Sequence, residues 1–126
     1  MSDTFWTRLF LVAGVYNLLA GLPMLLAPST MAGISGLAMP AGDLMFPRLA
    51  GSLIVTLGIG YFMVASDLVR HRSIAVLGVI GKLAAFALAA IYLAKGAIPF
   101  RAFLIGAGDL IFAVFFIRYL QTFAAR

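Results

Sequence analysis

Four strongly polar residues, Asn17, Arg48, Lys82 and Asp109, lie within or beside four long apolar runs, one to each run. Placing a charged side chain in the hydrocarbon core of a membrane costs about 2.5–3.5 kcal/mol on insertion scales. Such groups need partners, and they often mark a ligand site or a transport pathway. Asp109 is the one carboxylate among the four, so we expect it to neutralise Lys82, with Arg48 as a further candidate partner.

Small residues lie three or four positions from each of these polar residues, and positions at that spacing share a helix face. Small side chains mark faces where membrane helices approach closely. We therefore predict that the four polar residues turn toward one another and form a central polar cluster. The small neighbours are Ala13, Gly14, Ala20 and Gly21, then Gly51 and Ser52, then Gly78 and Ala85, and finally Gly106 and Ala113.

Two further residues belong to the candidate site. Tyr16, beside Asn17, could donate a hydrogen bond to a ligand, although a tyrosine satisfied within the core is the simpler interpretation. Ser52 could form a Ser–Lys couple with Lys82, yet no spacing demands that chemistry. The chain has no Cys and no Glu, a single His, and no Gly-x-Ser-x-Gly motif, so enzyme chemistry is poorly supported. We expect no catalytic residue, no metal and no cofactor.

The elements that must position these residues are four apolar segments, at about 5–27, 44–65, 73–94 and 100–120. Each has about 20 residues, enough for a helix to span a hydrocarbon core of about 30 Å. The runs are continuous rather than alternating, which favours helices over strands. Of all residues, 64% are hydrophobic and 10% are charged, so lipid must cover most of the surface. The prediction is one all-α domain, residues 1–126, forming an integral membrane four-helix bundle.

The connections and their charges predict an orientation. The segment 28–43 is longer and only weakly polar, and we expect an outer loop that lies at the membrane interface or folds back on the bundle. The side of the two termini carries more positive charge than the other side, which favours both termini in the cytoplasm. The first side has Arg8, Arg70, Arg72, Arg118 and Arg126, and the other has Arg48, Lys95 and Arg101. The net charge of +5 is not gathered into a basic helix, so we expect no nucleic-acid partner.

Three short motifs carry a resemblance to a known group of proteins. They are Phe46-Pro47-Arg48-Leu49-Ala50-Gly51, Gly81-Lys82-Leu83 and Gly108-Asp109-Leu110. With these motifs, residues 9–120 resemble small bacterial four-helix inner-membrane proteins that have no assigned function. The resemblance implies a bacterial inner-membrane location and adds no activity.

Three functions compatible with this pattern remain open. The first is a non-catalytic protein that binds a small amphiphile, a lipid or a partner subunit at the polar cluster. Counting Arg48 into that cluster favours an anionic headgroup or a carbonyl over a cation. The second is a small transporter or proton-coupled carrier, oligomeric, in which Asp109 titrates against Lys82. A membrane enzyme is the third. The ion pair could also serve only to specify packing.

Overall fold

The computed structural model of the chain describes residues 1–40 and 42–126, and within them it is helical without any strand. The five helices are α1 (Asp3–Leu26), α2 (Pro28–Ser35), α3 (Met45–Ser66), α4 (Arg72–Ala94) and α5 (Phe100–Phe123). The four longest are long and apolar enough to cross a membrane. The prediction of an all-α chain with four apolar spans is therefore confirmed, with no helix end shifted by more than three residues.

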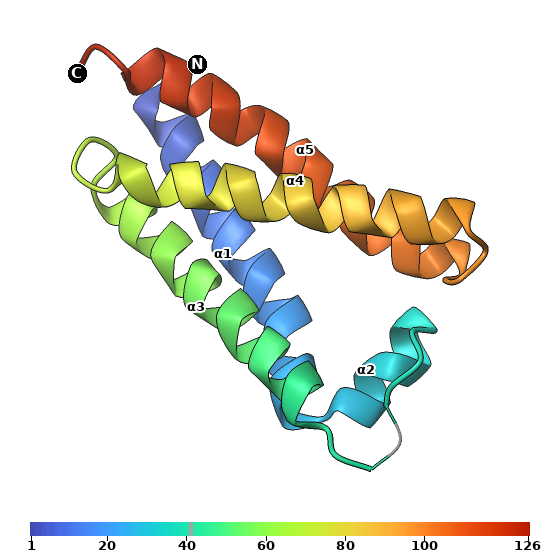
Figure 1. Cartoon of the computed structure of the whole chain (residues 1–126). Coiled ribbons are helices and arrows are strands. Elements are labelled where there is room, and N and C mark those ends of the chain that lie inside the picture. The colour runs from blue at the N-terminus through green and yellow to red at the C-terminus, as the bar shows by residue number, and fades with distance from the viewer. Residues whose placement is uncertain (41) are drawn as a thin grey trace.

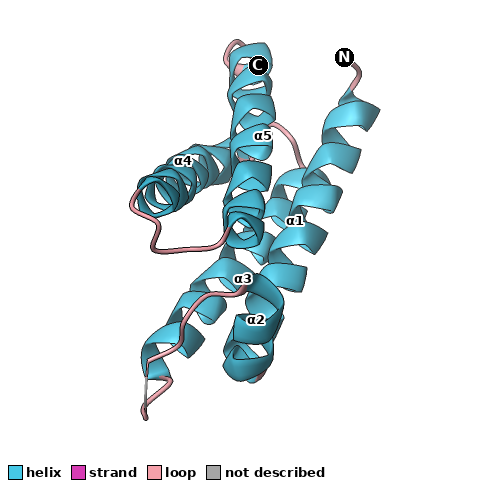
Figure 2. Cartoon of the chain, turned by 90° about the vertical axis from the view of Figure 1, so that its right-hand side faces the viewer, coloured by secondary structure: helices cyan, strands magenta, loops and turns pink. Residues whose placement is uncertain are grey.

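The long helices are arranged as two pairs, which Figure 1 shows as the two arms of a V. One arm is α1 with α3, and the other is α4 with α5. The arms meet where both chain ends and the α3–α4 turn lie, and they spread apart toward the other end. We call these the closed end and the mouth. Figure 2 shows the same arms from the side, with α2 near the mouth.

Glycines let the backbones of α1 and α3 come into direct contact. A Cβ on Gly51 would lie 2.5 Å from the backbone nitrogen of Leu25, and one on Gly21 would lie 2.9 Å from the carbonyl oxygen of Gly51. About two turns further along α3, a Cβ on Gly58 would lie 2.9 Å from the Cβ of Asn17. Close approach at small residues is a common way for helices to associate in a membrane. It places Asn17 directly against α3.

An aromatic core fills the closed end. Phe10 of α1 stacks on Phe116 of α5 at 4.7 Å between ring centroids, and both are fully buried. Tyr119 lies edge-on to Phe10 and donates a hydrogen bond to the carbonyl of Leu68. Trp6 and Tyr119 stand near the ends of their helices, where aromatics often face the membrane interface, but here both point inward. Burial of these large rings holds the two arms together at one end.

Polar contacts tie together the chain segments that meet outside this core. Arg72 donates from Nη1 to the backbone oxygens of Phe123 at 2.7 Å and Arg126 at 2.6 Å, at the end of α5 and just beyond it. In the α3–α4 turn, Asp67 Oδ1 accepts from the backbone N–H groups of Arg70 and Val69. The hydrogen bond from Arg70 is the main cause that lowers the pKa of the Asp67 carboxyl below its ordinary value.

The connection between α1 and α3 contains a helix that the sequence interpretation treated as loop. Pro28 begins α2, where its fixed φ suits a first helical position and its missing N–H costs nothing. Gly36 ends it with φ of +77°, the left-handed conformation common at a helix C-terminus. Gly36 also lies under the Arg101 side chain, since an added Cβ would be 2.7 Å from Arg101 Nη2. The fold-back expected for this segment thus takes the form of α2 resting against the start of α5.

Candidate functional site

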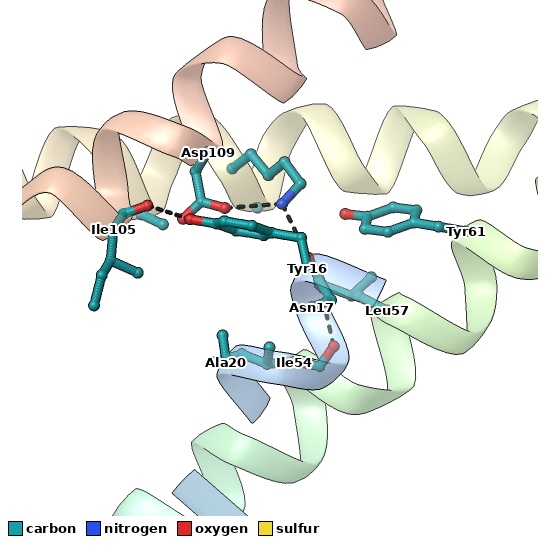
Figure 3. Close-up of a pocket in the computed structure, with 11 residues that line it drawn as sticks. Tyr16, Asn17, Ala20, Ile54, Leu57, Tyr61, Ile105 and Asp109 are labelled. Carbon is teal, nitrogen blue, oxygen red and sulfur yellow. Dashed lines mark hydrogen bonds and ion pairs between the residues drawn. The ribbon is translucent and has the colours of Figure 1, made fainter. Parts of the chain in front are cut away.

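Lys82 is the centre of a polar group where the two arms begin to separate. It lies ten positions after the start of α4, about 15 Å along the helix, and it is 4% exposed. Its Nζ lies 2.8 Å from Asp109 Oδ1 of α5 and donates to Asn17 Oδ1 of α1 at 3.1 Å. The pair joins α4 to α5, and the amide joins α4 to the opposite arm (Figure 3).

Asn17 extends this network to the third helix. Its Nδ2 donates to the carbonyl oxygen of Ile54 in α3 at 3.1 Å, while its Oδ1 accepts from Lys82. The absence of a side chain on Gly58 leaves room for this approach. One amide therefore satisfies groups on both arms at once, and α1, α3, α4 and α5 all contribute to a single set of hydrogen bonds.

Three aromatic rings surround the Lys82 ammonium group on the sides that Asn17 and Asp109 leave open. Nζ lies 5.1 Å from the ring centroid of Phe112, 5.2 Å from that of Tyr16 and 5.5 Å from that of Tyr61. A cation within about 6 Å of an aromatic face is attracted by the ring. The lysine is therefore compensated by one carboxylate, one amide oxygen and three rings.

Tyr16 spans the gap between α1 and α5. Its hydroxyl donates to the carbonyl oxygen of Ile105 at 2.6 Å. Its ring lies over Gly108, where an added Cβ would be 2.6 Å from the tyrosine oxygen. Gly108 thus provides the space that the Tyr16 side chain needs to reach α5.

A cavity of about 150 Å³ opens beside this network. Its polar lining comes from Tyr16, Asn17, Tyr61, Lys82 and Asp109, and apolar side chains of all four long helices complete it. Figure 3 shows these residues converging from different helices. The apolar part of the lining consists of Ala20, Ile54, Leu57, Gly81, Ala85 and Ile105.

The Tyr61 hydroxyl is the unusual group in this lining. Tyr61 is 0% exposed, and its oxygen has no hydrogen-bond partner within residues 1–40 and 42–126. The hydroxyl points toward the centre of the group in Figure 3. A Cβ on Gly78 would lie 2.9 Å from that oxygen, so the glycine leaves it room. A buried hydroxyl without a partner costs about 1–3 kcal/mol, so it calls for an explanation.

Sequence reasoning did not select Tyr61 as a site residue, although a signal was present. The residue follows Gly58 by three positions, and Gly58 follows Gly51 by seven, so all three share one face of α3. That face packs on α1, as the glycine contacts show. A tyrosine on a face of close helix contact is expected to be buried, and Tyr61 is buried.

Arg48 and Ser52 are not brought to the polar group. Arg48 donates from Nη1 to the carbonyl oxygen of Leu25 at 2.9 Å, and Ser52 donates to the carbonyl of Leu49 in its own helix. Both line a separate surface hollow with Asp43, near the start of α3. Arg48 precedes Ile54 by six positions, about 9 Å along the helix, and so lies away from Lys82. The positive charge expected from Arg48 is thus absent from the cluster.

The arrangement can hold a small polar group but offers few reactive ones. Lys82 and Asp109 balance each other in charge. No three His, Cys, Asp or Glu side chains gather anywhere in the part of the chain that the structure describes. The Asp109 side chain is 18% exposed, and its Oδ2 takes part in no hydrogen bond among the described residues. Among the described residues, the cavity lining therefore includes one buried polar atom without any partner, the Tyr61 oxygen, and one carboxylate oxygen that no hydrogen bond uses, Asp109 Oδ2.

No protein-family model, no curated protein and no solved structure matches this chain.

Proposed function

We propose that this chain is a non-catalytic membrane protein that holds the uncharged polar head of an amphiphile in the cavity beside Lys82. The observation that carries the proposal is the Tyr61 hydroxyl, fully buried beside the cavity that Tyr61 helps to line, and without a partner in the described residues. A ligand oxygen that accepted its proton would remove the penalty of about 1–3 kcal/mol for an unpaired buried hydroxyl.

The charge balance favours an uncharged head over an anion. Lys82 is already paired with Asp109 at 2.8 Å, and Arg48 lies outside the cluster. An anionic head would enter the cavity without an unpaired cation to meet it, and burying such a charge is costly. A hydroxyl suits both free groups, because it can accept from Tyr61 and donate to Asp109 Oδ2. A carbonyl suits the first of these groups.

The experiment compares two tyrosines that differ in whether their hydroxyl has a partner. The purified protein, in nanodiscs, is titrated with radiolabelled hexadecanol, and binding is followed by scintillation proximity. Tyr61→Phe removes the free donor, so we expect affinity to fall about five- to tenfold, as for the loss of one hydrogen bond. The unfolding transition should be unchanged or move upward, because the substitution removes an unpaired buried group.

Tyr119→Phe is the matched control, because that hydroxyl donates to Leu68 outside the cavity. We expect this variant to lose stability while keeping its affinity for hexadecanol. Hexadecanoate and hexadecyltrimethylammonium, which carry the same chain and a charge, should bind more weakly than the alcohol. Equal affinity of Tyr61→Phe and the unaltered chain, or tighter binding of either ion, would contradict the proposal.

We further propose that the four long helices cross a bacterial inner membrane with both termini in the cytoplasm. The excess of positive charge on the side of the termini supports this orientation. At the closed end, Arg8, Arg70 and Arg118 are exposed, where they would meet lipid headgroups and water.

A proton-coupled carrier, oligomeric in its active form, is the second candidate function. It is favoured by one observation, namely that the Lys82–Asp109 pair lies near the middle of its helices and borders a cavity. Ionisable groups at such positions serve as proton relays in transporters. The interior of proteoliposomes containing a pH-sensitive dye should then acidify, and Asp109→Asn should abolish this acidification. Absence of proton flux leaves the binding protein as the proposal.

A further inference from the structure

We propose that the ligand is an uncharged single-chain lipid, a long-chain alcohol or ketone, whose chain leaves the cavity between α1 and α5 past Tyr16. This inference rests on the proposed function and adds the class of ligand and its route.

A second hollow continues from the cavity toward the mouth. It has a volume of about 410 Å³, and its lining is apolar apart from the Tyr16 hydroxyl. The hollow and the cavity share Tyr16, Ala20 and Ile105, so they are neighbours across these residues. A polar end within the cavity and an apolar path beyond it match the two halves of an amphiphile. The remaining lining residues of the hollow are Leu19, Met31, Leu104 and Gly108.

The hollow is built from α1, α2 and α5, so it lies on one side of the V. Met31 of α2 is buried and contributes to the lining, while Leu19 and Leu104 are exposed. Leu104 precedes Asp109 by five positions, about 7.5 Å along α5 in the direction of the mouth. A chain that follows this path therefore runs along α5 and passes α2 on its way to the surrounding lipid.

Tyr16 separates the two spaces. Its hydroxyl is held by the single hydrogen bond to Ile105, and Gly108 leaves room beneath its ring. Turning this side chain about its own bonds would break that hydrogen bond and take the ring away from Lys82 Nζ and from Phe112. The bond is between α1 and α5, the two helices that flank the path. Tyr16 is thus a positioning residue that closes the path when no chain occupies it.

The size and charge of the cavity exclude a phospholipid head. One water needs at least about 10–15 Å³ of such volume, so 150 Å³ accommodates only a small group. A phosphate diester also needs a free cation or several free donors, whereas Lys82 is paired and Tyr61 is the one buried side-chain donor of the lining without a partner in the described residues. A hydroxyl or ketone meets these limits.

The test is photolabelling with a hexadecanol analogue that carries a diazirine at the middle of its chain. The protein in nanodiscs is irradiated, digested and mapped by mass spectrometry, with and without excess unlabelled hexadecanol. We expect labels on the α1, α2 and α5 residues of the hollow, removed by the competitor. An equal excess of a phospholipid should not remove them.

Leu104→Trp fills the hollow, and Leu88→Trp on α4 is its control. The two leucines are similarly exposed, at 53% and 58%, but Leu88 lines neither space. We expect Leu104→Trp to weaken hexadecanol binding about tenfold while octanol, which has a shorter chain, loses less. Leu88→Trp should change neither affinity.

The outcomes separate this inference from the function on which it rests. Competable labels on α3 and α4 alone, or equal effects of the two tryptophan variants, would overturn the route while Tyr61→Phe still weakened binding. Displacement of the label by phospholipid would overturn the ligand class. Absence of any competable label, together with no effect of Tyr61→Phe, would overturn the proposed function as well.

Discussion

At the scale of single residues, the buried ion pair is the strongest electrostatic feature of this chain. Lys82 Nζ and Asp109 Oδ1 form an ion pair at 2.8 Å, and Asn17 Oδ1 accepts a further hydrogen bond from Lys82. Removing one member of a buried pair leaves a charge without compensation, which costs about 3–5 kcal/mol. Replacing both members with apolar residues of similar size removes the charges together and is often neutral. The pair is therefore best tested by a double-mutant cycle.

We expect Lys82→Met and Asp109→Leu each to lower the free energy of unfolding by about 3 kcal/mol, because each substitution leaves the charge of the other residue buried and unpaired. The double variant should return close to the unaltered chain. Unfolding by SDS in mixed micelles, followed by circular dichroism, measures all four proteins. Asp3→Asn is the control, since its pair with Arg126 is exposed and worth about 0–1 kcal/mol. Additive losses in the double variant would mean that the two side chains do not stabilise each other.

At the scale of the helices, the contact between α1 and α3 determines where Asn17 lies. Gly21, Gly51 and Gly58 let the two backbones touch, and this closeness allows the Asn17 amide to reach Ile54. By contrast, α4 and α5 approach through Gly106, where an added Cβ would lie 2.8 Å from the Cβ of Ala89 and 3.8 Å from the nearest backbone atom, the Ala85 oxygen. The first pair thus has backbone against backbone, which leaves little room for adjustment.

Gly51→Ala should separate α1 from α3, because the new Cβ would lie 2.5 Å from the Leu25 nitrogen. Overpacking of this kind costs about 1–3 kcal/mol, more than the gain of up to about 1 kcal/mol from replacing a helical glycine. Gly81→Ala is the control, with its nearest contact at 3.7 Å. The same SDS titration should show a loss for Gly51→Ala and none for Gly81→Ala. A gain in stability for Gly51→Ala would show that the helices can adjust.

At the scale of the whole molecule, the V shape places the candidate site where the arms diverge. The aromatic core holds the closed end of the V (Figure 1), and the cavity lies next to this core, beside Lys82. The path proposed for the lipid chain runs toward the mouth, away from the aromatic core. The orientation of the V in the membrane therefore decides which half of the bilayer supplies the ligand.

The chain has no Cys, so single cysteines report this orientation directly. Ala97→Cys lies in the exposed α4–α5 turn and Ala124→Cys near the C-terminus. In intact bacteria, a membrane-impermeant maleimide should label Ala97→Cys, whereas Ala124→Cys should react only after permeabilisation. The cysteine-free chain controls for background labelling. The reverse pattern would place both termini outside.

Much of the architecture could be predicted from local sequence. Four continuous apolar runs predict four membrane-length helices, because backbone N–H and C=O groups surrounded by lipid must form hydrogen bonds with one another. The small residues beside Asn17, Lys82 and Asp109 predict which faces of their helices are buried. Pro28 and Gly36 also marked the ends of α2, a local signal that was assigned to a loop.

Only the tertiary structure decided which of these faces meet, and at what depth. The spacing of small residues around Arg48 resembles that around Lys82, yet Arg48 contacts Leu25 and takes no part in the pair. Tyr61 carries the free hydroxyl because Gly78 of another helix makes room for it. The physical reason is that helical periodicity determines only which way each side chain points around its own helix axis. Which residues of two helices lie at the same depth depends on how the two helices cross.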